Sequence, residues 1–198
     1  MGNLASVYKA LKYIGEDAMV TSDPEALRMS SGLIVPGVGA YGPAMEALKS
    51  KGLDIAIKEF AGTGRPVMGI CLGMQLFLTG SEEGAREGSL IEGLDLIPGK
   101  VLKFPKDKTV DSGLKVPQMG WNRLEDVTGS LMREGDYVYF VHSYYCAPDD
   151  DSASCAKTTY GIKYTAALEK DNIFATQFHP EKSGEAGLQM LIRFARGA

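Results

Sequence analysis

The sequence predicts an α/β fold, with an open, mostly parallel sheet flanked by helices and with added antiparallel strands in the second half. Two observations support this prediction. Up to about residue 80, short apolar runs alternate with amphipathic helical patterns, which is typical of a parallel sheet. Beyond that point, strand-like segments follow one another with turns between them, and one helical pattern closes the chain.

The first half contains a regular series of elements. Asn3 can cap a helix over 3–14 with Gly15 as its stop, and Asp23 before Pro24 marks a second helix start. A short strand is expected at 18–20, and the apolar run 33–35 between glycines predicts a strand buried on both faces. The further expected elements are helices over 43–50, 53–61 and 72–78 and a buried strand over 67–70.

The second half predicts strands near 100–104, 119–124, 136–141, 155–160, 163–168 and 172–177, followed by a last helix capped by Ser183. The chain therefore begins with a helix, whereas alternating α/β domains usually begin with a strand. Either the fold starts on a helix, or a first strand is missing from this chain.

Composition and length bound the classes of function. The chain has 198 residues, 44% hydrophobic and 23% charged, which favours one globular domain over residues 1–198. A net charge of −4 with scattered basic residues argues against a nucleic-acid partner. The longest apolar stretch, 67–74, is far shorter than the roughly 20 residues that span a bilayer, so no membrane association is expected.

Cysteine and histidine are scarce. Three cysteines, an odd number, do not make a disulfide framework, so we expect a reducing compartment and a cytoplasmic location. Their spacing relative to the two histidines fits no usual ligand pair, and we expect no metal. His142 and His179 are the only histidines available as an acid–base group.

The strongest local signal is Gly69-Ile70-Cys71-Leu72-Gly73, which follows a predicted buried strand and opens a helix. It has the G-x-nucleophile-x-G pattern of a nucleophile elbow, with cysteine as the nucleophile. At a helix start, free N–H groups stabilise a thiolate, and the Leu72 N–H can bind an oxyanion. The alternative is that Cys71 is a buried small hydrophobe. Cys146 and Cys155 have no such elbow and are interpreted as structural.

The second signal is Phe178-His179-Pro180-Glu181, directly after a predicted strand. The proline favours an extended backbone at His179, and in an extended segment residues i and i+2 face the same side, so Glu181 can orient the imidazole. The alternative is a strand-end histidine beside a surface glutamate. His142 is the rival base, and no acidic residue lies near it in the sequence.

The third signal is Gly37-Val38-Gly39-Ala40-Tyr41-Gly42, which spells the dinucleotide-binding pattern G-x-G-x-x-G. Against a nucleotide cofactor, Pro36 interrupts the strand-to-loop transition, and the carboxylate about 20 residues on, Glu59, falls within a predicted helix. The other interpretation is a glycine loop that supplies a second oxyanion donor to Cys71.

Pro36 to Gly39, Gly69 to Gln75 and His179-Pro180-Glu181 together resemble the class I (triad) glutamine amidotransferases. Within that class the sequence is similar to the glutaminase subunits of imidazole glycerol phosphate synthases over essentially the whole chain. The stretches that carry this closer similarity are Met1-Gly2-Asn3-Leu4, Pro36-Gly37-Val38-Gly39, Gly69-Ile70-Cys71-Leu72-Gly73-Met74-Gln75, Val116-Pro117-Gln118-Met119-Gly120-Trp121-Asn122, Tyr139-Phe140-Val141-His142-Ser143-Tyr144-Tyr145 and Phe178-His179-Pro180-Glu181-Lys182-Ser183.

The resemblance implies a flavodoxin-like sheet and a glutaminase that needs no cofactor. Cys71 would be the nucleophile and His179 the base, oriented by Glu181. The N–H groups of Leu72 and of the loop at Val38 and Gly39 would hold the oxyanion. The residues implied to hold glutamine are Gly39, Gln75, Ser143 and Tyr144.

Ammonia must stay unprotonated to act as a nucleophile, which favours handing it directly to a synthase partner, and the resemblance indicates which partner this is. That partner would be a (β/α)8-barrel cyclase subunit, bound as a heterodimer and faced by Asn3, Trp121 and Lys182. Related chains carry a strand ending in Asp-Tyr-Gly before the Met-Gly-Asn-Leu stretch, which agrees with an expected missing first strand. The alternatives are a glutaminase subunit of another amidotransferase, a catalytically weak docking subunit, and a different cysteine hydrolase.

Overall fold

The computed structural model describes residues 2–197, with side chains from Leu4 onward. Its helices are α1 (Gly2–Tyr13), α2 (Pro24–Met29), α3 (Tyr41–Ser50), α4 (Leu53–Ala61), α5 (Leu72–Leu76) and α6 (Gly184–Ala195). Its strands are β1 (Leu33–Gly37), β2 (Val67–Cys71), β3 (Leu78–Ser81), β4 (Ile91–Glu92), β5 (Ile97–Lys103), β6 (Gln118–Arg123), β7 (Tyr137–His142), β8 (Tyr144–Pro148), β9 (Ser154–Tyr160), β10 (Ile162–Lys170) and β11 (Ile173–Thr176).

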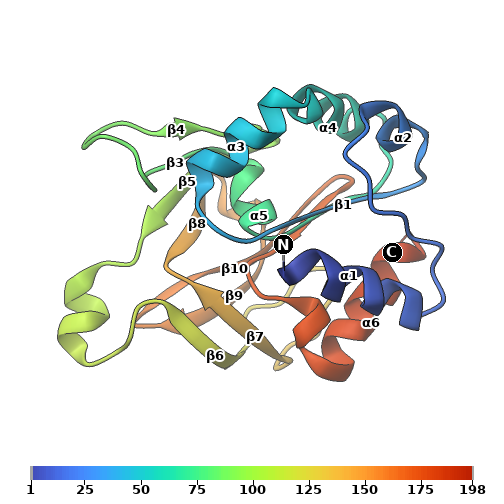
Figure 1. The fold of residues 1–198 in the computed structure, drawn as a ribbon. Coiled ribbons are helices and arrows are strands. Elements are labelled where there is room, and N and C mark those ends of the chain that lie inside the picture. Colours follow the sequence, from blue (N-terminus) through green and yellow to red (C-terminus); the bar gives the residue numbers. More distant parts are fainter. Residues whose placement is uncertain (1, 198) are drawn as a thin grey trace.

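A curled mixed sheet runs through the molecule (Figure 1). Across residues 2–197 it has nine strands in the order β1-β2-β11-β10-β8-β5-β3-β4, with β9 paired to β10, while β6 and β7 form a separate two-stranded sheet. The predicted α/β class is confirmed. The strands β1, β2 and β11 are mutually parallel, and most pairs in the second half are antiparallel.

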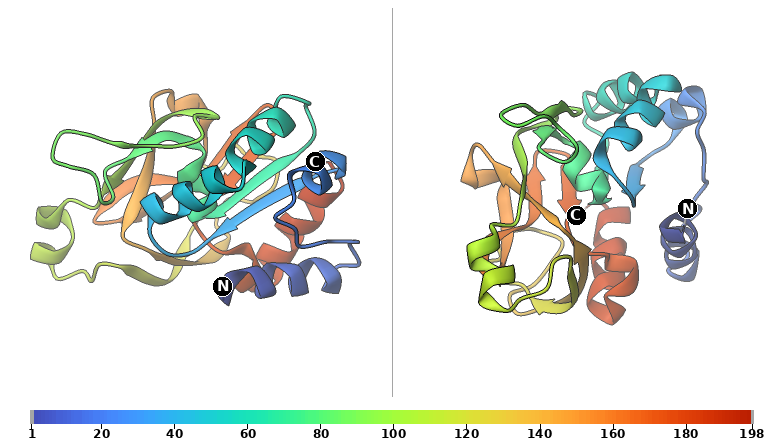
Figure 2. Two further views of the ribbon diagram at one scale, coloured as in Figure 1. Left: turned by 45° about the horizontal axis from the view of Figure 1, so that its top comes forward. Right: turned by 60° about the vertical axis from the view of Figure 1, so that its left-hand side comes forward.

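Helices cover both faces of the sheet. Figure 1 shows α2, α3 and α4 above it, whereas both views of Figure 2 place α1 against α6 on the opposite face. Each face has its own hydrophobic core. Leu27, Met45 and Phe60 belong to the first, and Val7 and Leu191 belong to the second. Burial of such side chains is the main stabilising contribution to the fold.

The edge of the sheet differs from the prediction. β1 was expected to be buried on both faces, but it is an edge strand in which only Val35 is buried. The expected strand at 18–20 is absent from the described structure, and Met19 and Val20 are exposed. A strand needs a neighbour to satisfy its backbone groups, and among the described residues β1 pairs only with β2. The expected leading strand stays a prediction.

Other elements also differ from their predicted bounds. The helix expected over 72–78 ends at Leu76, because Leu78 already pairs with Ile97 in the sheet. The strands predicted from the sequence do not include β3, β4 and β8. Ser183 precedes α6 as expected but does not cap it, since its hydroxyl donates to the His179 carbonyl and accepts from the Tyr139 N–H. That hydroxyl therefore ties the segment after β11 to β7.

The topology brings two chemically distinct segments together. Cys71 ends β2, and His179 follows β11, the strand that lies parallel to β2. The carboxyl ends of adjacent parallel strands meet at one edge of a sheet, which is where open α/β folds place their sites. In the part of the chain that is described, no helix is long and apolar enough to cross a membrane.

Candidate active site

Cys71 lies on a sharp turn between β2 and α5. Its φ of 55° is unusual for a residue that is not glycine, and such strained backbone clusters at functional sites. Glycines make the turn possible. A Cβ on Gly73 would lie 1.8 Å from the Val35 carbonyl oxygen, and one on Gly69 would lie 2.8 Å from the Gly73 backbone. The structure therefore supports the elbow predicted from the Gly69–Gly73 pattern.

His179 and Glu181 form a buried pair beside that turn. The Nδ1 of His179 donates to Oε1 of Glu181 at 2.9 Å, and both side chains are fully buried. His179 has the extended backbone that was expected, but residues Pro180–Lys182 form a short 3-10 turn rather than a continued strand. The two side chains thus meet across a turn and not by strand alternation.

Cys71 completes the line. Burial acts to lower the pKa of His179, but side-chain hydrogen bonds to Cys71 and Glu181, with the charge interactions of both, outweigh it and raise the pKa to about 9. A protonated His179 is consequently favoured at neutral pH. An imidazolium next to Cys71 stabilises negative charge on the sulfur, as an activated nucleophile requires.

His142 is held in a different role. Its Nδ1 donates to the Tyr144 carbonyl at 2.7 Å, and its Nε2 lies 3.0 Å from the Tyr164 hydroxyl. Burial, opposed by the Tyr144 carbonyl and reinforced by the charge of His179, lowers the pKa of His142 to about 4. Both ring nitrogens are engaged, so the geometry favours His179 over His142 as the base.

A pocket of about 270 Å³ is lined by Cys71. The glutamine-binding residues expected from the resemblance (Gly39, Gln75, Ser143 and Tyr144) all line it, and so do Val38, Leu72 and His179. The structure therefore gathers these residues around one opening, although they come from four separate segments of the chain.

Glu83, which was not predicted from the sequence, also lines the pocket. Its Oε2 accepts a hydrogen bond from the Tyr41 N–H at the start of α3, at 3.0 Å. This bond holds a carboxylate at the wall of the cavity. Glu83 lies in a polar loop with no local motif, so only the fold reveals it.

The glycine loop serves the elbow. Gly37 packs so tightly that a Cβ there would lie 2.9 Å from Cβ of Leu72, and Val38 and Gly39 line the pocket. Glu59, the carboxylate that a dinucleotide site would use, lies in α4 and pairs with Arg28 at 2.9 Å. These contacts favour the oxyanion-loop interpretation over a nucleotide cofactor.

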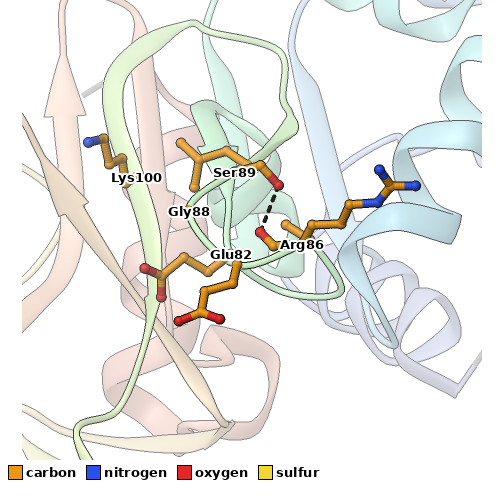
Figure 3. Close-up of a pocket in the computed structure, with 8 residues that line it drawn as sticks. Glu82, Arg86, Gly88, Ser89 and Lys100 are labelled. Atoms are coloured by element: carbon orange, nitrogen blue, oxygen red, sulfur yellow. Dashed lines mark hydrogen bonds between the residues drawn. The ribbon is translucent and has the colours of Figure 1, made fainter.

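A second cavity, of about 410 Å³, lies under the loop between β3 and β4. Figure 3 shows Glu82, Arg86, Ser89 and Lys100 around it, with the Ser89 hydroxyl donating to the Arg86 carbonyl at 2.7 Å. No cysteine or histidine is among its lining residues. Its lining has charges of both signs but no nucleophile–base pair. The pocket at Cys71 is therefore the candidate active site.

The other two cysteines are core residues. Burial raises the pKa of the Cys155 thiol to about 12, and burial likewise raises the pKa of Cys146. Both lie in strands, within the two hydrophobic cores. A thiol held neutral is a poor nucleophile, so their environment fits the structural role expected for them.

Aromatic side chains are exposed on β6 and β7. Trp121 is 56% exposed and meets the Tyr139 ring edge-on at 6.1 Å, while the Lys182 Nζ lies 6.0 Å from the centre of the same ring. Met119 is exposed nearby on β6. Asn3, the other residue expected at an interface, lies outside the described side chains. We call Met119, Trp121, Tyr139 and Lys182 the aromatic patch.

Comparisons with known proteins agree with this fold and site. The profile of the family "Glutamine amidotransferase class-I" matches residues 6–197, and the chain belongs to that family. Two relatives named "Imidazole glycerol phosphate synthase subunit HisH" place it more narrowly, among the HisH subunits. The protein from Chlorobaculum tepidum is 50% identical over 98% of this chain and 94% of its own length. The one from Methanothermobacter thermautotrophicus is 50% identical over 98% of this chain and 92% of its own length.

Solved structures share the fold. A crystal structure titled as a glutamine amidotransferase superposes with a TM-score of 0.74, at 18% identity, and covers 100% of this chain and 95% of that one. A structure of PurLQS from Thermotoga maritima gives a TM-score of 0.67 at 19% identity, over 98% of this chain and 92% of that one. The family assignment identifies the chain as an enzyme subunit of the glutamine amidotransferase class.

Proposed function

We propose that Cys71, His179 and Glu181 hydrolyse glutamine to glutamate and ammonia, and that the ammonia passes to a cyclase subunit bound at the aromatic patch. The observation that carries the proposal is the buried line from Cys71 through His179 to Glu181 at the carboxyl ends of β2 and β11. Nucleophile, base and orienting acid are the three parts that acyl transfer by cysteine requires.

The chemical steps follow from this line. The Cys71 thiolate attacks the side-chain amide carbon of glutamine, and the resulting oxyanion accepts hydrogen bonds from the Leu72 N–H and from an N–H of the loop at Val38 and Gly39. Protonated His179 gives its proton to the leaving nitrogen, so ammonia departs and a thioester remains. Neutral His179 then takes a proton from water, which attacks the thioester and releases glutamate and the free thiolate.

The pocket lining suits glutamine. Gln75, Ser143 and Tyr144 offer the donors and acceptors that a buried amide and carboxylate need. The Glu83 carboxylate supplies an opposite charge for the α-ammonium group, which neither glycine-loop backbone nor serine hydroxyl can provide. Glu83 thus adds a specificity residue to those expected from the sequence.

The proposed partner is a (β/α)8-barrel cyclase that makes imidazole glycerol phosphate and an aminoimidazole carboxamide ribotide in histidine biosynthesis. Bulk water at neutral pH would protonate ammonia, so direct transfer to a docked subunit protects its reactivity. Exposed Trp and Tyr rings are enriched at protein–protein contacts, and Trp121 and Tyr139 lie on β6 and β7 next to the segment that carries His179. The buried, unbridged cysteines are compatible with work in the cytoplasm.

Glutamine turnover by the chain alone is expected to be low and to rise when the cyclase and its nucleotide ligand are added. Coupling of the two sites protects glutamine from futile hydrolysis. Glutamate and ammonia release, measured with and without the cyclase, tests this expectation. A full rate without the partner would contradict the channelling proposal, and no release in the assembled complex would favour the alternative of a docking subunit.

A further inference from the structure

A series of hydrogen bonds through buried glutamine side chains ends on the sulfur of Cys71. Gln177, fully buried directly after β11, has its Nε2 3.8 Å from Sγ of Cys71. Its Oε1 accepts from Nε2 of Gln75 at 3.1 Å, and that same Nε2 donates to the Tyr144 carbonyl at 3.2 Å. The Tyr144 carbonyl, Gln75 and Gln177 thus link the wall of the glutamine pocket to the nucleophile.

The Tyr144 carbonyl sets the direction of donation in this series of hydrogen bonds. A main-chain carbonyl can only accept, so the NH₂ group of Gln75 must face Tyr144. The second hydrogen of that NH₂ group is then donated to Gln177, which requires the oxygen of Gln177 to face Gln75. The NH₂ group of Gln177 is consequently directed at the sulfur. Turning either amide over would set two donors or two acceptors against each other in the buried interior.

The sulfur needs such a donor because an acceptor lies close to it. The Val141 carbonyl oxygen is 3.9 Å from Sγ of Cys71, where it can accept from the neutral thiol. Once the thiol loses its proton, that carbonyl opposes the negative charge. Hydrogen bonds to ionised groups are stronger than those between neutral groups. The hydrogen bond that the Gln177 N–H donates to the sulfur is therefore stronger when Cys71 is a thiolate.

We propose that Gln177 is a further catalytic residue, whose amide N–H stabilises the thiolate of Cys71, and that Gln75 and the Tyr144 carbonyl hold it in that orientation. This proposal rests on the glutaminase function proposed above and adds a donor to its nucleophile. It gives Gln75 two roles, since this residue lines the glutamine pocket and also orients the amide of Gln177.

The test is the pH dependence of alkylation at Cys71 by iodoacetamide, with the modified cysteine identified by mass spectrometry. The rate follows the thiolate fraction. In Gln177→Met, which keeps the side-chain length and removes the N–H, the pH of half-maximal rate is expected to rise by roughly one unit. That rise lowers the rate about tenfold at pH values below the midpoint. A profile identical to that of the unmodified sequence would overturn the proposal.

A matched control separates the N–H from packing. Gln118 is also a buried glutamine, but its Oε1 accepts from the Tyr164 hydroxyl at 2.8 Å, and no hydrogen bond joins it to Cys71 in the described structure. Gln118→Met is expected to leave the alkylation profile unchanged, and an equal shift in both variants would overturn the proposal. If circular dichroism shows that Gln177→Met is unfolded, Gln75→Met provides the same test. It frees Gln177 to turn, so a smaller rise is expected and no rise would count against the proposal.

The readout is independent of glutamine turnover. Alkylation needs only the thiolate, so an unchanged profile in Gln177→Met would remove this donor and leave the proposed glutaminase standing. Conversely, a chain that shows the expected shift but releases no glutamate in the assembled complex would disprove the glutaminase and keep the donor.

Discussion

Replacing Cys71 by alanine is expected to lower the rate of glutamine hydrolysis by at least about 10⁴-fold, measured as glutamate release in the presence of the cyclase. The variant lacks the atom that forms the thioester. Water is a poor substitute for it, because the elbow positions the sulfur of residue 71, and not a solvent molecule, for attack. The fold should be retained, since a side chain smaller than cysteine fits the strained turn at the end of β2 without a new contact.

Two comparisons make this result specific. Cys155→Ala removes another buried thiol, in β9 and away from the pocket, and should keep hydrolysis within a few-fold of the unmodified chain. Association of Cys71→Ala with the cyclase, measured by size-exclusion chromatography, should be unaffected. Cys71 is buried, whereas Met119 and Trp121 of the aromatic patch are exposed. Glutamate release at the original rate from Cys71→Ala would exclude Cys71 as the nucleophile.

Glu181→Gln is expected to lower the same rate by roughly 10⁴-fold, the loss that follows when the acid orienting a catalytic histidine is replaced by its amide. The amide has nearly the same shape as the carboxylate but carries no charge. Without that charge the imidazolium of His179 loses a stabilising partner, so the pKa of His179 falls from about 9. The proton on His179 is then lost at lower pH.

The pH profile distinguishes this mechanism from a simple loss of packing. The working state has protonated His179 beside the thiolate, and it is lost as pH rises through the pKa of His179. The upper limb of the rate profile should lie near pH 9 in the unmodified chain and at lower pH in Glu181→Gln. Glu185→Gln, an exposed change on α6 whose partner is Gln189, should leave both rate and profile as they were. An unmoved upper limb in Glu181→Gln would argue against the proposed pairing.

Much of the fold was predictable because local signals agree with the tertiary structure. Asp23 caps α2 by accepting from the Glu25 N–H, and α4 has the predicted bounds, because its helical spacing and its buried face coincide. The elbow was predictable for a similar reason. Glycines at 69 and 73 are required by atoms within a few residues or on the adjacent strand.

Features that depend on distant partners were not predictable. Nothing in the order Ala18-Met19-Val20 reveals whether a neighbouring strand exists, and nothing at Ser183 reveals that its hydroxyl bonds to His179 and Tyr139 instead of to its own helix. Glu83 and Gln177 reach the site through contacts with Tyr41 and Gln75, which only the folded chain supplies. The extent of the domain, 1–198, and the leading strand stay predictions.

The proposed mechanism requires that Cys71 attacks the side-chain carbonyl carbon of glutamine. The most direct measurement is mass spectrometry of the chain, with its cyclase, after exposure to an electrophilic glutamine analogue such as a chloroketone, with and without excess glutamine. One adduct per chain on Cys71, prevented by glutamine, is the predicted result. Modification of Cys146 or Cys155 at an equal rate, or labelling that glutamine does not prevent, would contradict it.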